Sequence, residues 1–154
     1  MHEPLTLTAP ISPASLAPEI RVFAPTLERL ARLWPTVEPI LKRATDRSFA
    51  YQPIDILSLA MVGRMGVILV TEDDRIVAVA VTEVRQFPRC RVLEVPFVAG
   101  IGLKRWHLQL LDFIDAAAVG AGCSDIMGFL RRGWVKFGFE LDGVMVRRRV
   151  GGQP

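Results

Sequence analysis

The chain has 154 residues, of which 51% are hydrophobic and 23% charged, and its formal net charge is +3 at pH 7. This length fits one domain, and the apolar fraction excludes a chain that is disordered overall. No apolar run reaches the roughly 18 residues of a membrane-spanning helix, and the Met-His-Glu-Pro start lacks the features of a secretory signal. Cys90 and Cys123 have no metal-ligand spacing, so the sequence predicts two buried thiols and no metal site.

Residues 1–25 differ from the rest of the chain because they hold five of its eleven prolines. Proline at this density prevents helix and discourages central strands. A solvated tail would be more polar than this segment, whose large apolar residues are Leu5, Leu7, Ile11, Leu16, Ile20, Val22 and Phe23. The sequence therefore predicts an extended arm that lies on a surface, either of its own domain or of a neighbouring subunit.

Helical patterns follow the arm. From Thr26, a suitable N-cap, apolar residues recur at helical spacing. Pro35 interrupts this pattern, so residues 35–45 are predicted to form a second short helix. A further helix is predicted from Asp55, which can cap it, to about Arg64.

Three strands are predicted next. Two runs rich in β-branched residues, 67–71 and 75–84, are separated by a tight polar turn at 72–74, which is typical of a hairpin. A second turn at 87–89 leads to a strand over 90–98. These three strands are predicted to form an antiparallel meander.

A long amphipathic helix is predicted over residues 104–121, with Trp106 and Leu110 on a wide apolar stripe that must lie against the sheet. Gly122 ends it, and a short strand at 124–128 follows. A strand after a long helix indicates a right-handed crossover to a parallel neighbour. A brief helix and a last strand over 144–150 complete the pattern.

This order of elements, with two local motifs, resembles the GNAT superfamily of N-acetyltransferases. The motifs are Gly122-Cys-Ser-Asp-Ile126 and Trp134-Val-Lys-Phe-Gly-Phe139, and the second is similar to the aromatic-x-Lys-x-Gly-Phe ending of the family. The resemblance covers residues 26–150 and leaves 1–25 as the arm and 151–154 as a tail. It implies an α/β (α+β) fold with a mixed sheet, an antiparallel meander plus a parallel crossover, and helices on both faces.

Three further signals resemble divergent members of the superfamily that are encoded in bacteriophage genomes and prophages. They are Val81-Thr-Glu83, Phe87-Pro-Arg89 and Arg131-Arg-Gly-Trp134. This second resemblance implies a place in the host cytoplasm or in the phage particle.

In the superfamily, acetyl-CoA lies between the fourth and fifth strands, and an Arg/Gln-x-x-Gly-x-Gly/Ala loop at the start of the long helix holds its pyrophosphate. Gly100-Ile-Gly102 resembles this loop, but counting back from Gly122 places the loop on residues 104–107, which include no glycine. Lys104 and Arg105 offer positive charge there, but their bulky side chains crowd the approach of a pyrophosphate to the backbone N–H groups. Pro96 lacks an N–H and weakens strand pairing, as a cofactor slot requires, or is an ordinary edge residue. The cofactor-binding residues implied are Val95, Val98, Ala99, Gly100, Gly102, Lys104 and Arg105.

The resemblance also implies positions for the acid and the base. Glu94 lies in the strand where family enzymes often place a general base, and it faces either the cleft or solvent. Glu83 is interpreted as structural. Trp134 occupies the position where many members have a tyrosine that protonates the leaving thiolate, and an indole is too weak an acid for that role. Tyr51 is the single tyrosine and is predicted in a loop before the strands.

Two functions follow from these observations. The first is a GNAT-fold protein of phage type that acts in virion assembly or protein–protein interaction, with acetyl transfer lost or vestigial and no cofactor required. Its partners would be other protein subunits bound through residues 1–25. The cluster Arg147–Arg149 is either a charged edge strand protected against unwanted pairing or a contact for nucleic acid or an acidic partner. The second is an active acetyl-CoA-dependent N-acetyltransferase that acts on a small amine or a protein amino group.

Overall fold

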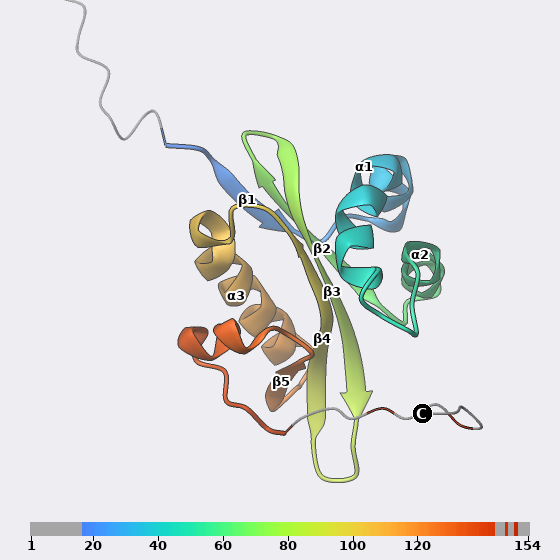
Figure 1. Ribbon diagram of the computed structural model, residues 1–154, viewed down its shortest axis with the longest axis vertical. Coiled ribbons are helices and arrows are strands. Elements are labelled where there is room, and N and C mark those ends of the chain that lie inside the picture. The colour runs from blue at the N-terminus through green and yellow to red at the C-terminus, as the bar shows by residue number, and fades with distance from the viewer. Residues whose placement is uncertain (1–16, 144–146, 148–149, 151–154) are drawn as a thin grey trace, which may run out of the picture.

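The computed structural model of the protein describes residues 17–143, 147 and 150. A five-stranded sheet forms its centre, in the order β1-β2-β3-β4-β5. Helices α1 (Leu27–Thr45) and α2 (Pro53–Met61) cover one face, and α3 (Leu103–Gly120) covers the other (Figure 1). Each face has its own apolar cluster, with Val79, Val81 and Phe97 turned toward α1 and Ala78, Ala80 and Val95 turned toward α3.

The strands are β1 (Ile20–Phe23), β2 (Gly66–Glu72), β3 (Arg75–Gln86), β4 (Arg91–Gly100) and β5 (Asp125–Gly128). Each of the first four strands pairs antiparallel with the next, and β5 pairs parallel with β4. The predicted meander, the crossover helix and the mixed sheet with helices on both faces are confirmed.

The end of the predicted arm is a strand of the domain's own sheet. Ile20–Phe23 pair antiparallel with β2, and the backbone N–H of Glu19 donates to Asp73 Oδ1 at 2.9 Å. Proline is tolerated at the ends of an edge strand, and Pro18 and Pro25 flank β1. This part of residues 1–25 therefore lies on its own domain. Residues 1–16 and the predicted tail, 151–154, are outside the described residues.

The prediction of two helices between residues 26 and 45 is wrong. One helix, α1, runs from Leu27 to Thr45 with Pro35 and Pro39 inside it. Both prolines are exposed, whereas the intervening residue Val37 is fully buried against the sheet. Tertiary packing of the buried face outweighs the two backbone hydrogen bonds that the prolines cannot donate.

Replacing these prolines is expected to stabilise the protein. In Pro35→Ala or Pro39→Ala the new backbone N–H completes the helical ladder, so the free energy of unfolding should rise by about 1–3 kcal/mol per site. Urea denaturation monitored by circular dichroism measures this, with Arg32→Ala, an exposed neighbour, as the control expected to stay within about 0.5 kcal/mol. A loss of stability in both proline variants would contradict this explanation of α1.

Helix α2 is shorter than predicted. Gln52 is its N-cap, while Asp55 lies in the first turn and accepts a hydrogen bond from the Gln52 backbone N–H at 2.8 Å. The helix ends at Met61 and not near Arg64, and Gly63 has a φ of +75° that a helix cannot continue through.

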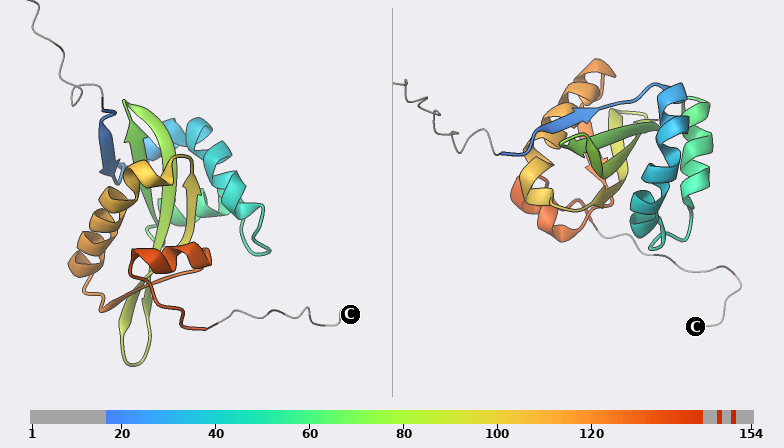
Figure 2. Two further views of the ribbon diagram at one scale, coloured as in Figure 1. Left: turned by 60° about the vertical axis from the view of Figure 1, so that its left-hand side comes forward. Right: turned by 90° about the horizontal axis from the view of Figure 1, so that it is seen from above.

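The C-terminal part turns back onto α3. A 3₁₀ helix, η2 (Arg132–Phe137), lies on the α3 side of the sheet (Figure 2). Of the predicted last strand, residues 144–146 and 148–149 are outside the described residues. Arg147 is described, and its guanidinium carbon lies 4.2 Å from the centre of the Phe49 ring, between α1 and α2.

Candidate functional site

A bulge interrupts β4 at the centre of the sheet. Between the cross-strand pairs Val81–Phe97 and Glu83–Glu94, β3 advances by two residues and β4 by three. The extra residue changes which face β4 presents, so Val95 packs on the α3 side and Phe97 on the α1 side. Pro96 lies between them and has no N–H to pair.

The bulge coincides with the end of the β4–β5 pairing. β5 pairs with Val92–Val95 of β4, and its last pair is Val95 with Gly128. Among the described residues, the stretch 96–100 of β4 has β3 on one side and no strand on the other. The predicted cofactor residues Val95, Val98 and Ala99 therefore lie at and beyond the point where the two strands separate.

The glycines at the end of β4 lie directly at the start of α3. Gly100 is the last residue of β4, and Gly102 is the N-cap of α3 with a left-handed φ of +76°. Residues 104–107, on which counting back from Gly122 places the loop, form the first turns of the helix. The first N–H groups of a helix have no partner within it and carry positive partial charge, so an anion is stabilised there.

Arg105 covers this loop. Its guanidinium occupies the space that a side chain on Gly102 would fill, and its Nε donates to Glu72 Oε2 at 3.0 Å. Trp106 Nε1 donates to the Ile101 carbonyl at 2.7 Å and ties the loop to the helix, while Lys104 is exposed beside it. The predicted crowding by side chains thus comes from Arg105, which is turned away from β5 toward the end of β2.

Glu94 belongs to a chain of ion pairs on the α1 side of the sheet. It is 5% exposed, and its Oε2 lies 2.5 Å from Arg85 Nε. Arg85 Nη2 also lies 3.6 Å from Glu83 Oε2. The other oxygen of that carboxylate, Glu83 Oε1, lies 3.9 Å from Arg64 Nη2. Burial raises the pKa of Glu94 above its ordinary value, Arg85 opposes this shift, and the carboxylate of Glu83 adds to it. Of the two orientations that the sequence left open, the cleft or solvent, this burial excludes solvent.

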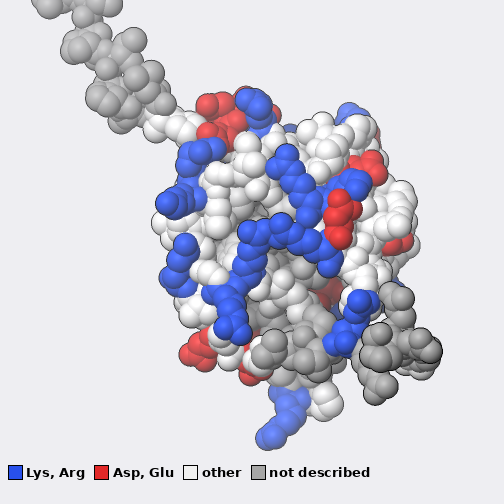
Figure 3. All heavy atoms as spheres, in the orientation of Figure 1, with Lys and Arg blue, Asp and Glu red and all other residues white. Residues whose placement is uncertain are grey.

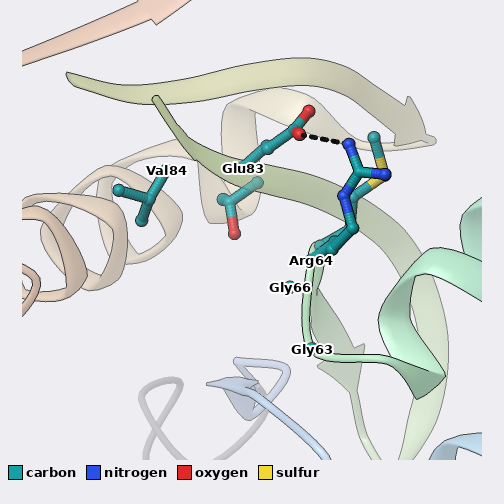
Figure 4. A pocket seen from close by; sticks show the side chains of 7 residues that line it. Gly63, Arg64, Gly66, Glu83 and Val84 are labelled. Atoms are coloured by element: carbon teal, nitrogen blue, oxygen red, sulfur yellow. Dashed lines mark ion pairs between the residues drawn. The ribbon is translucent and has the colours of Figure 1, made fainter. Parts of the chain in front are cut away.

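An open hollow of about 550 Å³ adjoins this chain. Arg64 and Glu83, two of its lining residues, point toward one another and form an ion pair (Figure 4). The segment after α2 and the middle of β3 supply its lining, which consists of Gly63, Arg64, Met65, Gly66, Thr82, Glu83 and Val84. A ligand in the hollow would therefore meet the ion-pair chain at Glu83.

Trp134 is an anchor for η2. Its side chain is 8% exposed and makes edge contacts with Phe137 and Phe139, with ring centroids 5.4 and 6.0 Å apart. The Phe137 ring in turn stacks on the His107 ring of α3, with the two ring centroids 4.4 Å apart. These contacts hold the C-terminal segment against α3, and they account for the tryptophan by packing.

Sequence reasoning missed three contributors to this region. Arg64 and Arg85 complete the ion-pair chain, and the Tyr51 ring packs edge-on against Phe97 at 5.7 Å, beside the bulge. The alternation Glu83, Arg85 on one strand, with Glu94 on the next, was a usable signal because i and i+2 share a face. Nothing in the sequence places Tyr51 beside β4.

Basic side chains gather across the middle of the face that Figure 1 turns to the viewer (Figure 3).

In the described part of the chain, no helix is long and apolar enough to cross a membrane. No group of three His, Cys, Asp or Glu side chains in residues 17–143, 147 and 150 is arranged as metal ligands would be.

No protein-family model and no curated protein sequence matches the chain. Solved structures do match it. A possible acetyltransferase from Clostridium difficile 630 has 12% identity over 85% of this chain and 97% of that chain, with a TM-score of 0.64. The ribosomal-protein-alanine N-acetyltransferase from Brucella melitensis biovar Abortus 2308 has 12% identity over 86% and 100%, with a TM-score of 0.67. A Trypanosoma brucei acetyltransferase has 14% identity over 86% and 100%, with a TM-score of 0.63. At these identities the likeness concerns the fold, and on that ground the chain has the GNAT fold.

Proposed function

We propose that this protein is an acetyl-CoA-dependent N-acetyltransferase that acts on a small amine or a protein amino group. The observation that carries the proposal is the position of Glu94, a buried carboxylate in β4 two residues before Pro96, where β4 and β5 separate. Burial raises the pKa of Glu94, which brings it closer to the range useful for a general base at neutral pH.

The residues around the opening fit an extended thioester cofactor. The unpaired edge of β4, which includes Val98 and Ala99, offers backbone groups to the amides of a pantetheine chain. The start of α3 after Gly102 offers backbone N–H groups to a pyrophosphate. Lys104 is exposed beside it. Arg105, which now forms an ion pair with Glu72, would bind a phosphate in its place. The basic face in Figure 3 would attract such an anion.

When bound, acetyl-CoA supplies an activated acetyl group. Glu94 accepts a proton from the acceptor amine, directly or through a water molecule. The deprotonated nitrogen would form the new bond to the acetyl carbon in place of the coenzyme A sulfur, and the second proton of the nitrogen would pass through solvent to the leaving thiolate. Trp134 contributes no proton because an indole N–H is too weak an acid.

Acetyl-CoA is expected to stabilise the folded protein. At 100 times its dissociation constant, a ligand that binds only the folded state raises the free energy of unfolding by about 2.7 kcal/mol. Thermal unfolding with increasing acetyl-CoA measures this. Gly102→Asp, which places a negative charge and a strained backbone at the start of α3, should abolish the response, whereas Gly120→Asp at the other end of the helix should keep it. No response of the natural sequence at millimolar acetyl-CoA would contradict the proposal.

A second candidate is a phage-type role in virion assembly or protein–protein interaction, with acetyl transfer lost or vestigial. It is favoured by Trp134, which is buried by packing at the usual acid position, and by Arg105, which lies over Gly102. Its partners would be other subunits that bind residues 1–25, with nucleic acid as a further partner. Absence of acetyl-CoA binding, together with self-association that is lost when residues 1–16 are removed, would support this candidate.

A further inference from the structure

Tyr51, the only tyrosine of the chain, lies between α1 and α2 with its ring against the sheet. The ring is half-buried beside the apolar cluster under α1 and packs edge-on against Phe97, with the two ring centroids 5.7 Å apart. Ser48 fixes the backbone, because its Oγ accepts a hydrogen bond from the Tyr51 backbone N–H at 3.2 Å. Packing and this short turn therefore set the position of the ring.

The hydroxyl group of Tyr51 is not explained by that packing. Every buried polar side-chain atom in the described part of the chain has a hydrogen-bond partner. The Tyr51 hydroxyl has none among these residues, so it reaches solvent. A buried tyrosine usually directs its hydroxyl to a protein partner. Phenylalanine would fill the same space against Phe97, and the hydroxyl is left available for a ligand.

The ring lies beside the opening between β4 and β5. Phe97, on which Tyr51 packs, is the second residue after Val95, where the pairing of β4 with β5 ends. Phe97 and Glu94 both lie on the α1 side of the sheet, on either side of Pro96. Tyr51 and Glu94 therefore stand on the same face of the sheet, next to the stretch of β4 whose edge is open. An acetyl group at this opening would lie between a proton acceptor and a proton donor.

We propose that Tyr51 donates the proton that the departing coenzyme A thiolate takes up. This inference rests on the proposed function and replaces the unassisted passage of that proton through solvent. As the carbon–sulfur bond breaks, the phenolic proton passes to the sulfur. Tyr51 then recovers a proton from solvent, which takes up the second proton of the acceptor nitrogen, so the protons balance and the hydroxyl is restored. A phenol is a stronger acid than the indole of Trp134, which gives no proton here.

A titration that needs no turnover tests the contact between Tyr51 and the sulfur. Because the chain has one tyrosine, a carbon isotope label at tyrosine Cζ gives one magnetic resonance signal, which reports on Tyr51. Coenzyme A should shift this signal, whereas desulfo-coenzyme A, with hydrogen in place of the thiol, should shift it much less. Both compounds should raise the thermal unfolding temperature. Equal shifts, or no shift while both compounds bind, would overturn the assignment and leave the proposed function standing. Failure of both to bind would remove the two together.

The leaving group separates proton donation from other roles of Tyr51. Tyr51→Phe is expected to lower kcat with acetyl-CoA about 100-fold, with an unchanged urea midpoint because the hydroxyl has no partner among the described residues. A selenol is a stronger acid than a thiol, so its anion leaves without a proton. With acetyl selenocoenzyme A, the natural protein and Tyr51→Phe should therefore react at nearly the same rate.

Phe49→Leu, at an exposed aromatic position of the same segment, is the matched control and should keep both rates. An equal loss of kcat with the thioester and the selenoester in Tyr51→Phe would mean that the hydroxyl binds the acceptor, and the assignment of Tyr51 as proton donor would be wrong. Unchanged rates with both esters would exclude it as well.

Discussion

Glu94→Gln is expected to slow acetyl transfer by about 100-fold or more, while acetyl-CoA binding is retained. A positioned general base contributes about 10²–10⁴ to the rate, and glutamine keeps the size of the side chain and an acceptor for Arg85 but cannot take up a proton. Release of the coenzyme A thiol in the presence of an amine measures the rate. Glu38→Gln, an exposed glutamate on α1, is the matched control and should be as active as the natural protein. Equal rates for the two variants would remove Glu94 from the mechanism.

The pH dependence gives an independent readout of the same residue. Because burial raises the pKa of Glu94, kcat/KM should fall as the pH is lowered through that raised value, and this step should be absent from the residual activity of Glu94→Gln. The effect on stability has the opposite sign to that of a carboxylate whose pKa is lowered in the folded state. The folded state holds the Glu94 proton more tightly than the unfolded state, so stability falls as the pH rises from the ordinary pKa of 4.5 to the raised value.

Urea denaturation at several pH values tests that sign. The difference in the free energy of unfolding, Glu94→Gln minus the natural protein, should be larger above the raised pKa than at pH values below 4.5. Below 4.5, Glu94 is protonated in both the folded and the unfolded state. The reverse trend would mean that the ion pair with Arg85 outweighs burial.

Trp106→Ala is expected to cost about 3–5 kcal/mol of the free energy of unfolding, the range for removing a large buried aromatic side chain. Trp106 is 1% exposed, packs in the α3 cluster, and donates its indole N–H to the Ile101 carbonyl at 2.7 Å. Trp106→Phe should lose less, because most of the packing remains and one hydrogen bond worth about 1 kcal/mol is removed. Both are measured by urea denaturation.

The same variants probe the loop at the start of α3. In Trp106→Phe the Ile101 carbonyl loses its tie to the helix, so acetyl-CoA should bind more weakly even though the protein is folded. Leu108→Ala, at an exposed position of the same helix, should change stability by less than about 0.5 kcal/mol and leave binding intact. An equal loss in Trp106→Ala and Leu108→Ala would contradict the burial of Trp106 as the cause.

Local patterns were sufficient for the central part of the fold. The β-branched runs and the tight turn at Glu72–Asp74 lead to β2 and β3, and the apolar stripe with Trp106 and Leu110 leads to α3. In these segments the hydrophobic period and the turn residues agree with the final packing. Where a local signal competed with packing, as at Pro35, the tertiary structure prevailed and α1 continued.

The sequence by itself determined the antiparallel meander, the long helix and the crossover to a parallel strand, because periodicity and turn chemistry act over a few residues. The candidate strand for the base came from the resemblance to the superfamily. Only the tertiary structure decided that Ile20–Phe23 join the sheet, that β4 bulges before Phe97, and that Gly102 starts α3. It alone placed Glu94 under Arg85 and opposite Glu83. Strand register and burial depend on contacts between segments far apart in the chain, and no local pattern encodes them.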